Sequence, residues 1–354
     1  MQPQLSRRQS TILKLIVQEY IRTGRAVGSK SLLERYDLGV SPATVRSEMG
    51  ELEEQQFLAH PHTSAGRVPT DRGYRYYVEY LLDDTSLPVP EQITIRHQFR
   101  QVEAQVESWA KLAAAVLADL SGNLSLVTPP RSSVERMRHF ELISLRSRVV
   151  LLITVTQAGT VREVILPLTE EIGQEQLSAL SQRLNPLIRD LTHEQIRRLA
   201  EGAGDLPGLV LHQIADVLRL AEQEAQSEVI AEGLDYVLQQ PELGHGALAQ
   251  RLLELLRGGA ILSVLIPQLK TGEGVQVIIG TENRAAELHP FAVVLASYGA
   301  RGHAAGFLGI IGPTRMRYGR SISTVRYVSQ VMTDLLRDIY ETDDEERSHH
   351  ERGR

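Results

Sequence analysis

The stretch SPATVRSEMGELEEQQFLAHPHTSAGRVPTDRGYRYYV, residues 41–78, decides the fold of the N-terminal part of the chain. Ser41 is a favourable helix N-cap, and Pro42 suits the first helical position, where its missing N–H would be unpaired in any case. Three apolar residues then recur at i, i+4 and i+7: Val45, Met49 and Leu52. This spacing predicts a helix with one buried stripe.

The front of this predicted helix carries small and hydrogen-bonding residues that lie off the buried stripe. They are Ala43, Thr44, Arg46 and Ser47. Small residues let a helix enter a DNA major groove, an arginine there can reach guanine or a phosphate, and hydroxyls can bond base edges or the backbone. We therefore expect a recognition helix for DNA, with contacts from Ser41, Ala43, Thr44, Arg46 and Ser47. The same pattern also fits a protein-binding module whose helix front is solvated.

The residues before this helix predict two more helices. Ser6 opens a capping-box pattern, and the helix that follows it ends at Gly24. The segment SKSLLERY, residues 29–36, predicts a second, short helix that begins with Ser29 and Lys30. The order helix, helix, turn, helix is that of a helix-turn-helix unit, and we expect both residues near the DNA backbone.

The residues after the recognition helix predict a β-hairpin. FLAHPH, residues 57–62, fits a short strand, TSAG a turn, and RVP, residues 67–69, a returning strand. A hairpin appended to a helix-turn-helix unit is a wing, which lies along the DNA backbone or minor groove. We expect wing contacts to DNA from four residues: His62, Ser64, Gly66 and Arg67.

The helix predicted after the hairpin has an apolar side and a basic side. Thr70 can cap it, and Tyr74 and Tyr77 fall on the inner stripe, where we expect them to pack in a core. Arg72 and Arg75 lie off that stripe. We assign them to the face shared by the wing and the recognition helix, with Arg72 as a phosphate contact; a solvated helix face is the alternative.

These residues also resemble a known family. The stretch from about Leu5 to Leu82, and PHTSAGRVPTDRGYR within it above all, is similar to HrcA, the bacterial heat-inducible transcription repressor family. GFLGIIGPTRMRYGRSISTVRYVSQVM, residues 306–332, resembles the C-terminal signature of the family, and VIIGTEN, residues 277–283, resembles another of its segments.

The resemblance implies a multidomain α+β fold. It consists of a winged helix-turn-helix domain and a GAF-like α/β/α domain into which an α+β dimerisation domain is inserted. It also implies a homodimer that binds double-stranded DNA at an inverted-repeat operator called CIRCE, represses chaperone operons and is released by heat. The GroE chaperonin is the further partner that the resemblance implies. On this basis we expect the winged-helix domain at residues 1–84.

The chain after residue 84 fits this organisation. Residues 85–131 and 241–342 are assigned to the GAF-like domain. Within it, apolar residues from Ile95 to Leu120 predict one long helix. Their near-heptad spacing suits packing against the same helix of another copy or against the chain's own sheet. Its predicted strands are ILSVLI, GVQVIIG, FAVVLASYG and HAAGFLGIIGP, and a last helix starts at Ser321. The charged tail, residues 343–354, is predicted to be disordered.

Residues 132–240 are assigned to the inserted domain. The runs MRHFELISL, RVVLLITVT and TVREVILPL predict an antiparallel meander. Helical patterns follow from residue 173 to 240, with breaks at Asn185-Pro186, in GAGDLPG and near Gln226. One helix of this region is the expected subunit contact, through Ile214, Val217, Leu218 and Leu220.

Composition narrows the classes of function. Cysteine is absent, which excludes disulfides, thiolate nucleophiles and Cys-ligated metal sites. Residues 1–82 contain 11 Lys and Arg against 9 Asp and Glu, whereas the whole chain has a formal net charge of −6, so a polyanion would meet the N-terminal part. We find no catalytic motif, and expect no enzyme activity, no cofactor, no metal site and no membrane contact. The expected location is the cytoplasm, at the nucleoid. A GAF-type regulator that senses a small ligand is the alternative function.

Overall fold

The computed structural model describes the chain except for a few short segments. The described residues are 5–61, 66–83, 86–102, 105–132, 135–157, 159–243, 246–257, 260–269, 274–299 and 304–351. The chain divides into two compact units. The first consists of Met1–Pro130, Val229–Gly299 and Gly306–Arg354, and the second of Arg131–Glu228 and Ala300–Ala305.

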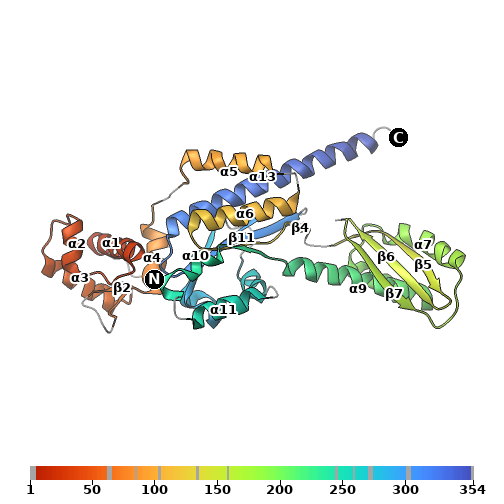
Figure 1. Ribbon diagram of the computed structural model, residues 1–354, viewed down its shortest axis with the longest axis horizontal. Helices are drawn as coiled ribbons and strands as arrows, with labels where there is room; N and C mark the ends of the chain where they lie inside the picture. The colour runs from red at the N-terminus through yellow and green to blue at the C-terminus, as the bar shows by residue number, and fades with distance from the viewer. Residues whose placement is uncertain are drawn as a thin grey trace. The chain divides into compact units, whose positions relative to one another are not determined.

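The N-terminal module, residues 5–83 of the first unit, contains the predicted helices (Figure 1). Its elements are α1 (Arg7–Thr23), α2 (Ser29–Arg35), α3 (Pro42–Glu54), β1 (Leu58–Ala59), β2 (Val68–Pro69), α4 (Asp71–Tyr76) and a π-helical turn (Tyr77–Leu81). The Ser6 capping box begins α1, and Gly24, with φ 64°, ends it in a left-handed conformation that suits glycine. β1 pairs antiparallel with β2.

A central antiparallel sheet forms the body of the first unit. The strand order is β8 (Ile230–Glu232), β3 (Leu124–Val127), β11 (Ala304–Pro313), β10 (Phe291–Gly299) and β9 (Gln276–Ile279). The short strand β4 (Arg131–Ser132) pairs with the first residues of β11. The strands predicted in GVQVIIG, FAVVLASYG and HAAGFLGIIGP are thus confirmed as β9, β10 and β11.

Helices cover both faces of the central sheet. Along β10, Val294 and Ala296 belong to a core shared with α6 (Val106–Ser121) and α13 (Tyr318–Glu351), whereas Val293 and Leu295 belong to a core on the other face. Because successive strand residues point to opposite faces, such a continuous apolar run fits a sheet covered on both sides. Figure 1 shows α6 and α13 side by side along the sheet.

The remaining elements of the first unit are short. They are α5 (Val89–Gln101), α10 (Leu234–Leu238), α11 (Ala247–Leu256), α12 (Ala260–Leu265), and the 3₁₀ turns Pro241–Leu243, Ile266–Gln268, Gly280–Glu282 and Ala286–Leu288. Leu252 of α11 and Leu262 of α12 are buried in the core that contains Val293 and Leu295 of β10.

Four predictions for the first unit were wrong. The expected long helix is two helices, because Val102 and Gln105 have extended backbone conformations. ILSVLI is helix α12, since Ile261, Leu262 and Leu265 are buried at helical spacing. Residues 230–232, expected to be helical, form β8 and pair with β3. The tail predicted to be disordered continues α13 as far as Glu351.

The second unit is an antiparallel meander with helices on one face. β5 (Met137–Arg146) pairs with β6 (Val149–Thr156), which pairs with β7 (Val161–Pro167), as predicted. The helices are α7 (Gln174–Ile188), α8 (His193–Ala200) and α9 (Asp205–Ser227), and Figure 1 shows α7 and α9 beside the sheet. The break predicted at Pro186 was wrong, because α7 includes this residue and ends at Ile188.

The expected subunit contact on α9 is mostly covered by the chain itself. Ile214 and Leu218 are fully buried in the core between α9 and the meander, and Val217 is 6% exposed. Leu220 alone of the four is exposed. The apolar periodicity of this helix therefore reports packing on its own sheet, and the expectation of a subunit contact through Ile214, Val217 and Leu218 was wrong.

Candidate nucleic-acid interface

The Ser41 side chain caps the N-terminus of α3. The Ser41 hydroxyl accepts a hydrogen bond from the Thr44 backbone N–H at 3.2 Å and lies 2.9 Å from the Thr44 hydroxyl. Ala43, Arg46 and Ser47 are exposed, whereas Thr44 is half-buried. The buried stripe holds the other side of the helix in place, since Val45, Met49 and Leu52 are each at most 3% exposed.

Arg46, on the front of α3, has a side chain that is available to bind a partner molecule. No hydrogen bond or ion pair of its side chain occurs among the described residues, and the residue is exposed. At the start of α2, Lys30 is likewise exposed and Ser29 is half-buried. The structure thus exposes most of the predicted contacts in α2 and α3.

The residues at the base of the hairpin have structural roles. The backbones of Arg67 and Val27 exchange two hydrogen bonds of 2.9 Å, and the guanidinium of Arg67 pairs with Glu53 of α3 at 2.7 Å. A Cβ on Gly66 would lie 2.7 Å from the carbonyl carbon of Ala26, so the hairpin packs too closely against the segment between α1 and α2 for a side chain at this position. His62 and Ser64 lie outside the described residues.

The two arginines of α4 face different surroundings. Arg72 is exposed and lies over the ring of Phe57, 4.7 Å from its centroid. Arg75 instead faces the body of the first unit: its Nε donates to Glu282 at 2.7 Å and its Nη2 to the Val277 carbonyl at 2.6 Å. The assignment of Arg75 to the DNA-facing side was therefore wrong, because a carboxylate 207 residues away in the sequence binds it.

A second contact beside Arg75 attaches the N-terminal module to the body of the unit. Asp71 accepts hydrogen bonds from the backbone N–H and the hydroxyl of Thr281, at 2.8 and 2.9 Å. The ring centroids of Tyr74 and Tyr318 lie 5.7 Å apart in the core, and burial raises the pKa of both phenols. The core role expected for Tyr74 is confirmed, and Tyr77 is also buried.

Sequence reasoning missed the acidic partners of these arginines. Glu53 and Glu282 bind Arg67 and Arg75, so these two arginines are not free to contact DNA. No local sequence motif identifies either glutamate as such a partner. Glu282 lies within the recognised segment VIIGTEN, but its pairing depends on a tertiary contact.

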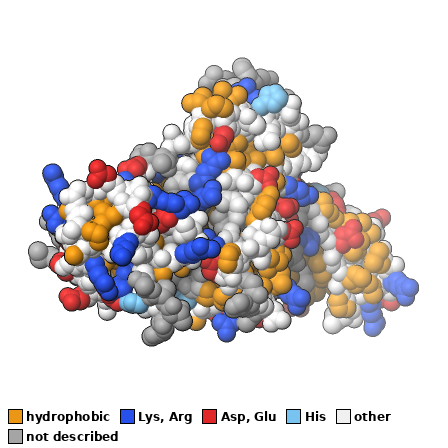
Figure 2. Space-filling model, turned by 60° about the vertical axis from the view of Figure 1, so that its left-hand side comes forward, with side chains coloured by type: hydrophobic (Ala, Val, Ile, Leu, Met, Phe, Trp, Pro, Cys, Tyr) orange, Lys and Arg blue, Asp and Glu red, His pale blue; other side chains and the backbone are white. Residues whose placement is uncertain are grey.

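The surface of the molecule is mixed in charge. Figure 2 shows Lys and Arg side chains on the face that comes forward, with Asp and Glu side chains between them. Across the part of the chain that the structure describes, no group of three or more His, Asp or Glu is placed to hold a metal ion. No described helix is long and apolar enough to cross a membrane.

Comparisons with known proteins agree with these observations. A family model described as the HrcA protein C-terminal domain matches residues 107–322. A heat-inducible transcription repressor HrcA from Thermomicrobium roseum is 53% identical over 96% of this chain and 97% of its own length, and one from Roseiflexus castenholzii is 44% identical over 95% and 96%. A crystal structure of a hypothetical protein superposes with a TM-score of 0.58 and 25% identity, covering 94% of this chain and 97% of that one.

The N-terminal helices, the mixed helix and sheet body and these relatives define a transcription repressor rather than an enzyme. The chain belongs to the HrcA family.

Proposed function

We propose that the chain represses transcription by binding a specific DNA sequence through the front of α3. The N-terminal module, within residues 1–84, would act as a winged helix-turn-helix domain, with β1 and β2 at the base of its wing. In this proposal Arg46 and Ser47 contact bases, and Ser29, Lys30 and Arg72 contact phosphates. Ser41, Ala43 and Thr44 shape the end of the helix that enters the groove.

The observation that carries this proposal is the availability of Arg46. Arg67 and Arg75 are bound to Glu53 and Glu282, whereas Arg46 is exposed on a capped helix and has no partner among the described residues. An exposed arginine near a helix N-terminus is suited to the guanine edge or a phosphate. For Arg67 we propose a change from the predicted role: it positions the hairpin against α3.

The test is a comparison of one variant on two DNAs. Arg46→Ala should weaken binding to an inverted-repeat operator by about 1–3 kcal/mol and leave binding to random duplex nearly unchanged. Arg198→Ala, an exposed arginine of the second unit, is the matched control and should change neither. Fluorescence anisotropy at fixed salt measures both affinities. Equal losses on the two DNAs would refute base recognition by Arg46.

We further propose a homodimer formed through the open face of the β5–β6–β7 meander. The helices of the second unit pack on one face, while Ile143, Val161 and Ile165 on the strands are 40%, 57% and 63% exposed. Exposed apolar clusters of this kind mark interaction surfaces. A twofold dimer would present two copies of α3 to the two halves of an inverted repeat.

The dimer proposal is tested by a charge on that face. Ile165→Asp should convert the dimer to a monomer in analytical ultracentrifugation, because an unpaired carboxylate would be buried. Leu187→Asp changes an equally exposed leucine on α7, 61% exposed, and should leave the dimer intact. A dimer that persists in Ile165→Asp with unchanged affinity would contradict this interface.

The proposed domain division follows the same line. The central sheet with α6 and α13 supports a GAF-like domain, and the compactness of residues 131–228 supports an inserted dimerisation domain that ends before β8. We propose the cytoplasm, at the nucleoid, as the location.

The regulated genes and the release step are also part of the proposal. By family membership, the target is the CIRCE inverted repeat of chaperone operons, and the GroE chaperonin is the further partner. Warming would dissociate a marginal dimer and so remove the gain from binding two half-sites together. The test measures sedimentation and operator binding of the same sample at a series of temperatures. Release of the operator DNA by a dimer that is still fully folded would contradict this step.

A further inference from the structure

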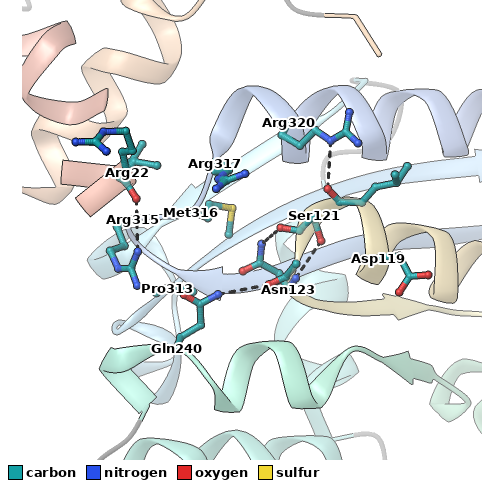
Figure 3. Close-up of a pocket in the computed structure, with 13 residues that line it drawn as sticks. Arg22, Asp119, Ser121, Asn123, Gln240, Pro313, Arg315, Met316, Arg317 and Arg320 are labelled. Atoms are coloured by element: carbon teal, nitrogen blue, oxygen red, sulfur yellow. Dashed lines mark hydrogen bonds between the residues drawn. The ribbon is translucent and has the colours of Figure 1, made fainter. Parts of the chain in front are cut away.

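Two hollows in the first unit differ in how their arginines are engaged. The larger one, about 610 Å³, is shown in Figure 3, and the chain itself binds two of the arginines that line it. The Nη1 of Arg315 donates to the Ile21 carbonyl at 3.5 Å, and the Nε of Arg320 donates to the Leu120 carbonyl at 3.2 Å. The smaller hollow, about 310 Å³, lies beside α5, and the arginines that line it are not engaged in this way.

The smaller hollow lies between the outer side of α5 and Tyr327 of α13. The inner side of α5 carries Ile95 and Phe99, which are at most 3% exposed and belong to a core that α13 shares. The Tyr327 hydroxyl donates to the Gln92 carbonyl at 2.9 Å, and Figure 1 shows α5 beside α13. The outer side of α5 is therefore held in place while it stays exposed.

The outer side of α5 has an apolar half and a basic half. Val89 and Ile93 are each 65% exposed, and both border the hollow. Arg96 and Arg100 follow on the same side of the helix, at i+7 and i+11 from Val89, and we call these four residues the α5 stripe. Exposed aliphatic residues are ordinary when they occur singly, but two that border one hollow form an apolar surface, which indicates an interaction site.

The two arginines of the α5 stripe have no acidic partner in the described part of the chain. Arg96 and Arg100 are exposed, and their side chains make neither a hydrogen bond nor an ion pair with a described residue. Glu91, the one acidic residue of α5, is bound to Arg320 at 2.6 Å. The chain has a formal net charge of −6, yet it leaves this surface positive. Charge complementarity therefore favours an anionic partner.

The apolar half of the stripe favours an acidic protein segment over a nucleic acid. A nucleic-acid backbone would pair with the arginines and leave Val89 and Ile93 without a matching surface. The stripe spans about 16 Å from Val89 to Arg100, at about 1.5 Å per residue, which suits a peptide rather than a single small ligand. An acidic amphipathic peptide matches both halves, because arginine binds carboxylates bidentately and a hydrophobic groove receives aliphatic side chains.

We propose that the α5 stripe docks an acidic, leucine-bearing segment of another protein. Aliphatic side chains of this segment bind Val89 and Ile93 at the hollow, and its carboxylates pair with Arg96 and Arg100. The proposal does not depend on the proposed DNA-binding function, because α3 takes no part in this site.

The test uses the full chain and fluorescence anisotropy of labelled synthetic peptides. The probe is a peptide about as long as α5 that consists of Asp, Glu and Leu. One counterpart has Lys in place of every acidic residue, and the other has Ser in place of every Leu. The probe should bind saturably, and each counterpart should bind at least about tenfold more weakly, since one loses the ion pairs and the other loses the apolar contact.

Variants of the stripe should change probe binding without changing the fold, because the side chains are exposed. Arg96→Ala/Arg100→Ala should weaken probe binding by about tenfold, from about threefold for each exposed ion pair. Arg96→Glu/Arg100→Glu should reverse the preference, so that the lysine counterpart binds more tightly than the probe. Arg284→Ala is the matched control, an exposed arginine of the same unit with no ion pair among the described residues, and should change neither.

Several results would overturn the proposal. Absence of saturable probe binding, or equal binding of the leucine-free counterpart, would remove the docking of an amphipathic segment. Arg96→Ala/Arg100→Ala that loses affinity for random duplex but not for the probe would assign the stripe to nucleic acid. Ile93→Asp that converts a dimer to a monomer in analytical ultracentrifugation would assign it to a second copy of the chain. Since the peptide titrations contain no DNA, their failure leaves the DNA-binding proposal standing, and the reverse also holds.

Discussion

Replacing Arg75 by methionine tests how the N-terminal module is attached to the body of the first unit. Methionine keeps the apolar stem and removes the bonds to Glu282 and to the Val277 carbonyl. Hydrogen bonds to charged groups contribute about 1.5–3 kcal/mol each when well buried. Because the side chains of Arg75 and Glu282 are 24% and 34% exposed, solvent screens part of this energy. We therefore expect the free energy of unfolding to fall by about 2 kcal/mol in total.

The assay is urea unfolding followed by tryptophan fluorescence. The chain has one tryptophan, Trp109, which is buried in the core that α1, α4 and α13 share, so its signal reports the first unit. Arg96→Met, an exposed arginine of α5, is the control and should have little effect. A double-mutant cycle with Glu282→Gln should give a coupling energy of about 1 kcal/mol or more, whereas independent sites add within about 0.5 kcal/mol. Additive effects of the two changes would refute the attachment.

Further predictions concern packing and pH. Gly73→Ala should lower the melting temperature, because the added Cβ would lie 2.2 Å from the Phe57 carbonyl oxygen. Gly50→Ala should instead stabilise the chain by about 0.5–1 kcal/mol, because Gly50 lies in mid-helix and a Cβ there would have nothing within 4 Å. Equal effects of the two substitutions would contradict this packing. The hydrogen bond from Arg22 lowers the pKa of Glu19, so Glu19 stabilises the fold above its unfolded pKa of about 4.3, and this stability is lost as pH falls through the lower folded pKa. Glu19→Gln should flatten the acid limb of a urea stability profile between pH 3 and 6, and an unchanged limb would refute the linkage.

Local signals in the sequence were sufficient for the helices of the N-terminal module. The caps at Ser6, Ser41 and Thr70 are short-range hydrogen bonds, so the residues that make them are adjacent in sequence. The three strand-like runs of the meander were likewise predicted from local sequence, whereas the structure adds that burial alternates along β6.

Tertiary contacts explain the predictions that were wrong. The run ILSVLI is apolar throughout, and periodicity alone does not distinguish a short buried strand from a short buried helix. β8 is short and exists through its pairing with β3, so its local pattern carries little information.

The candidate site shows the same division between local and tertiary signals. The exposed front of α3 could be predicted because capping and helical spacing are local properties. The pairing of Arg67 with Glu53 and of Arg75 with Glu282 could not, because each depends on how separate elements pack.

The most direct test of the account is a binding titration of the unmodified chain on two duplexes of equal length and base composition. One contains the inverted repeat, and in the other both half-sites are scrambled. At physiological salt the account predicts a preference for the intact repeat of about 10³-fold or more, with two chains bound per repeat. Affinities that agree within about threefold, when specific sites normally exceed non-specific DNA by at least about 10³-fold, would contradict recognition of the repeat by paired α3 helices.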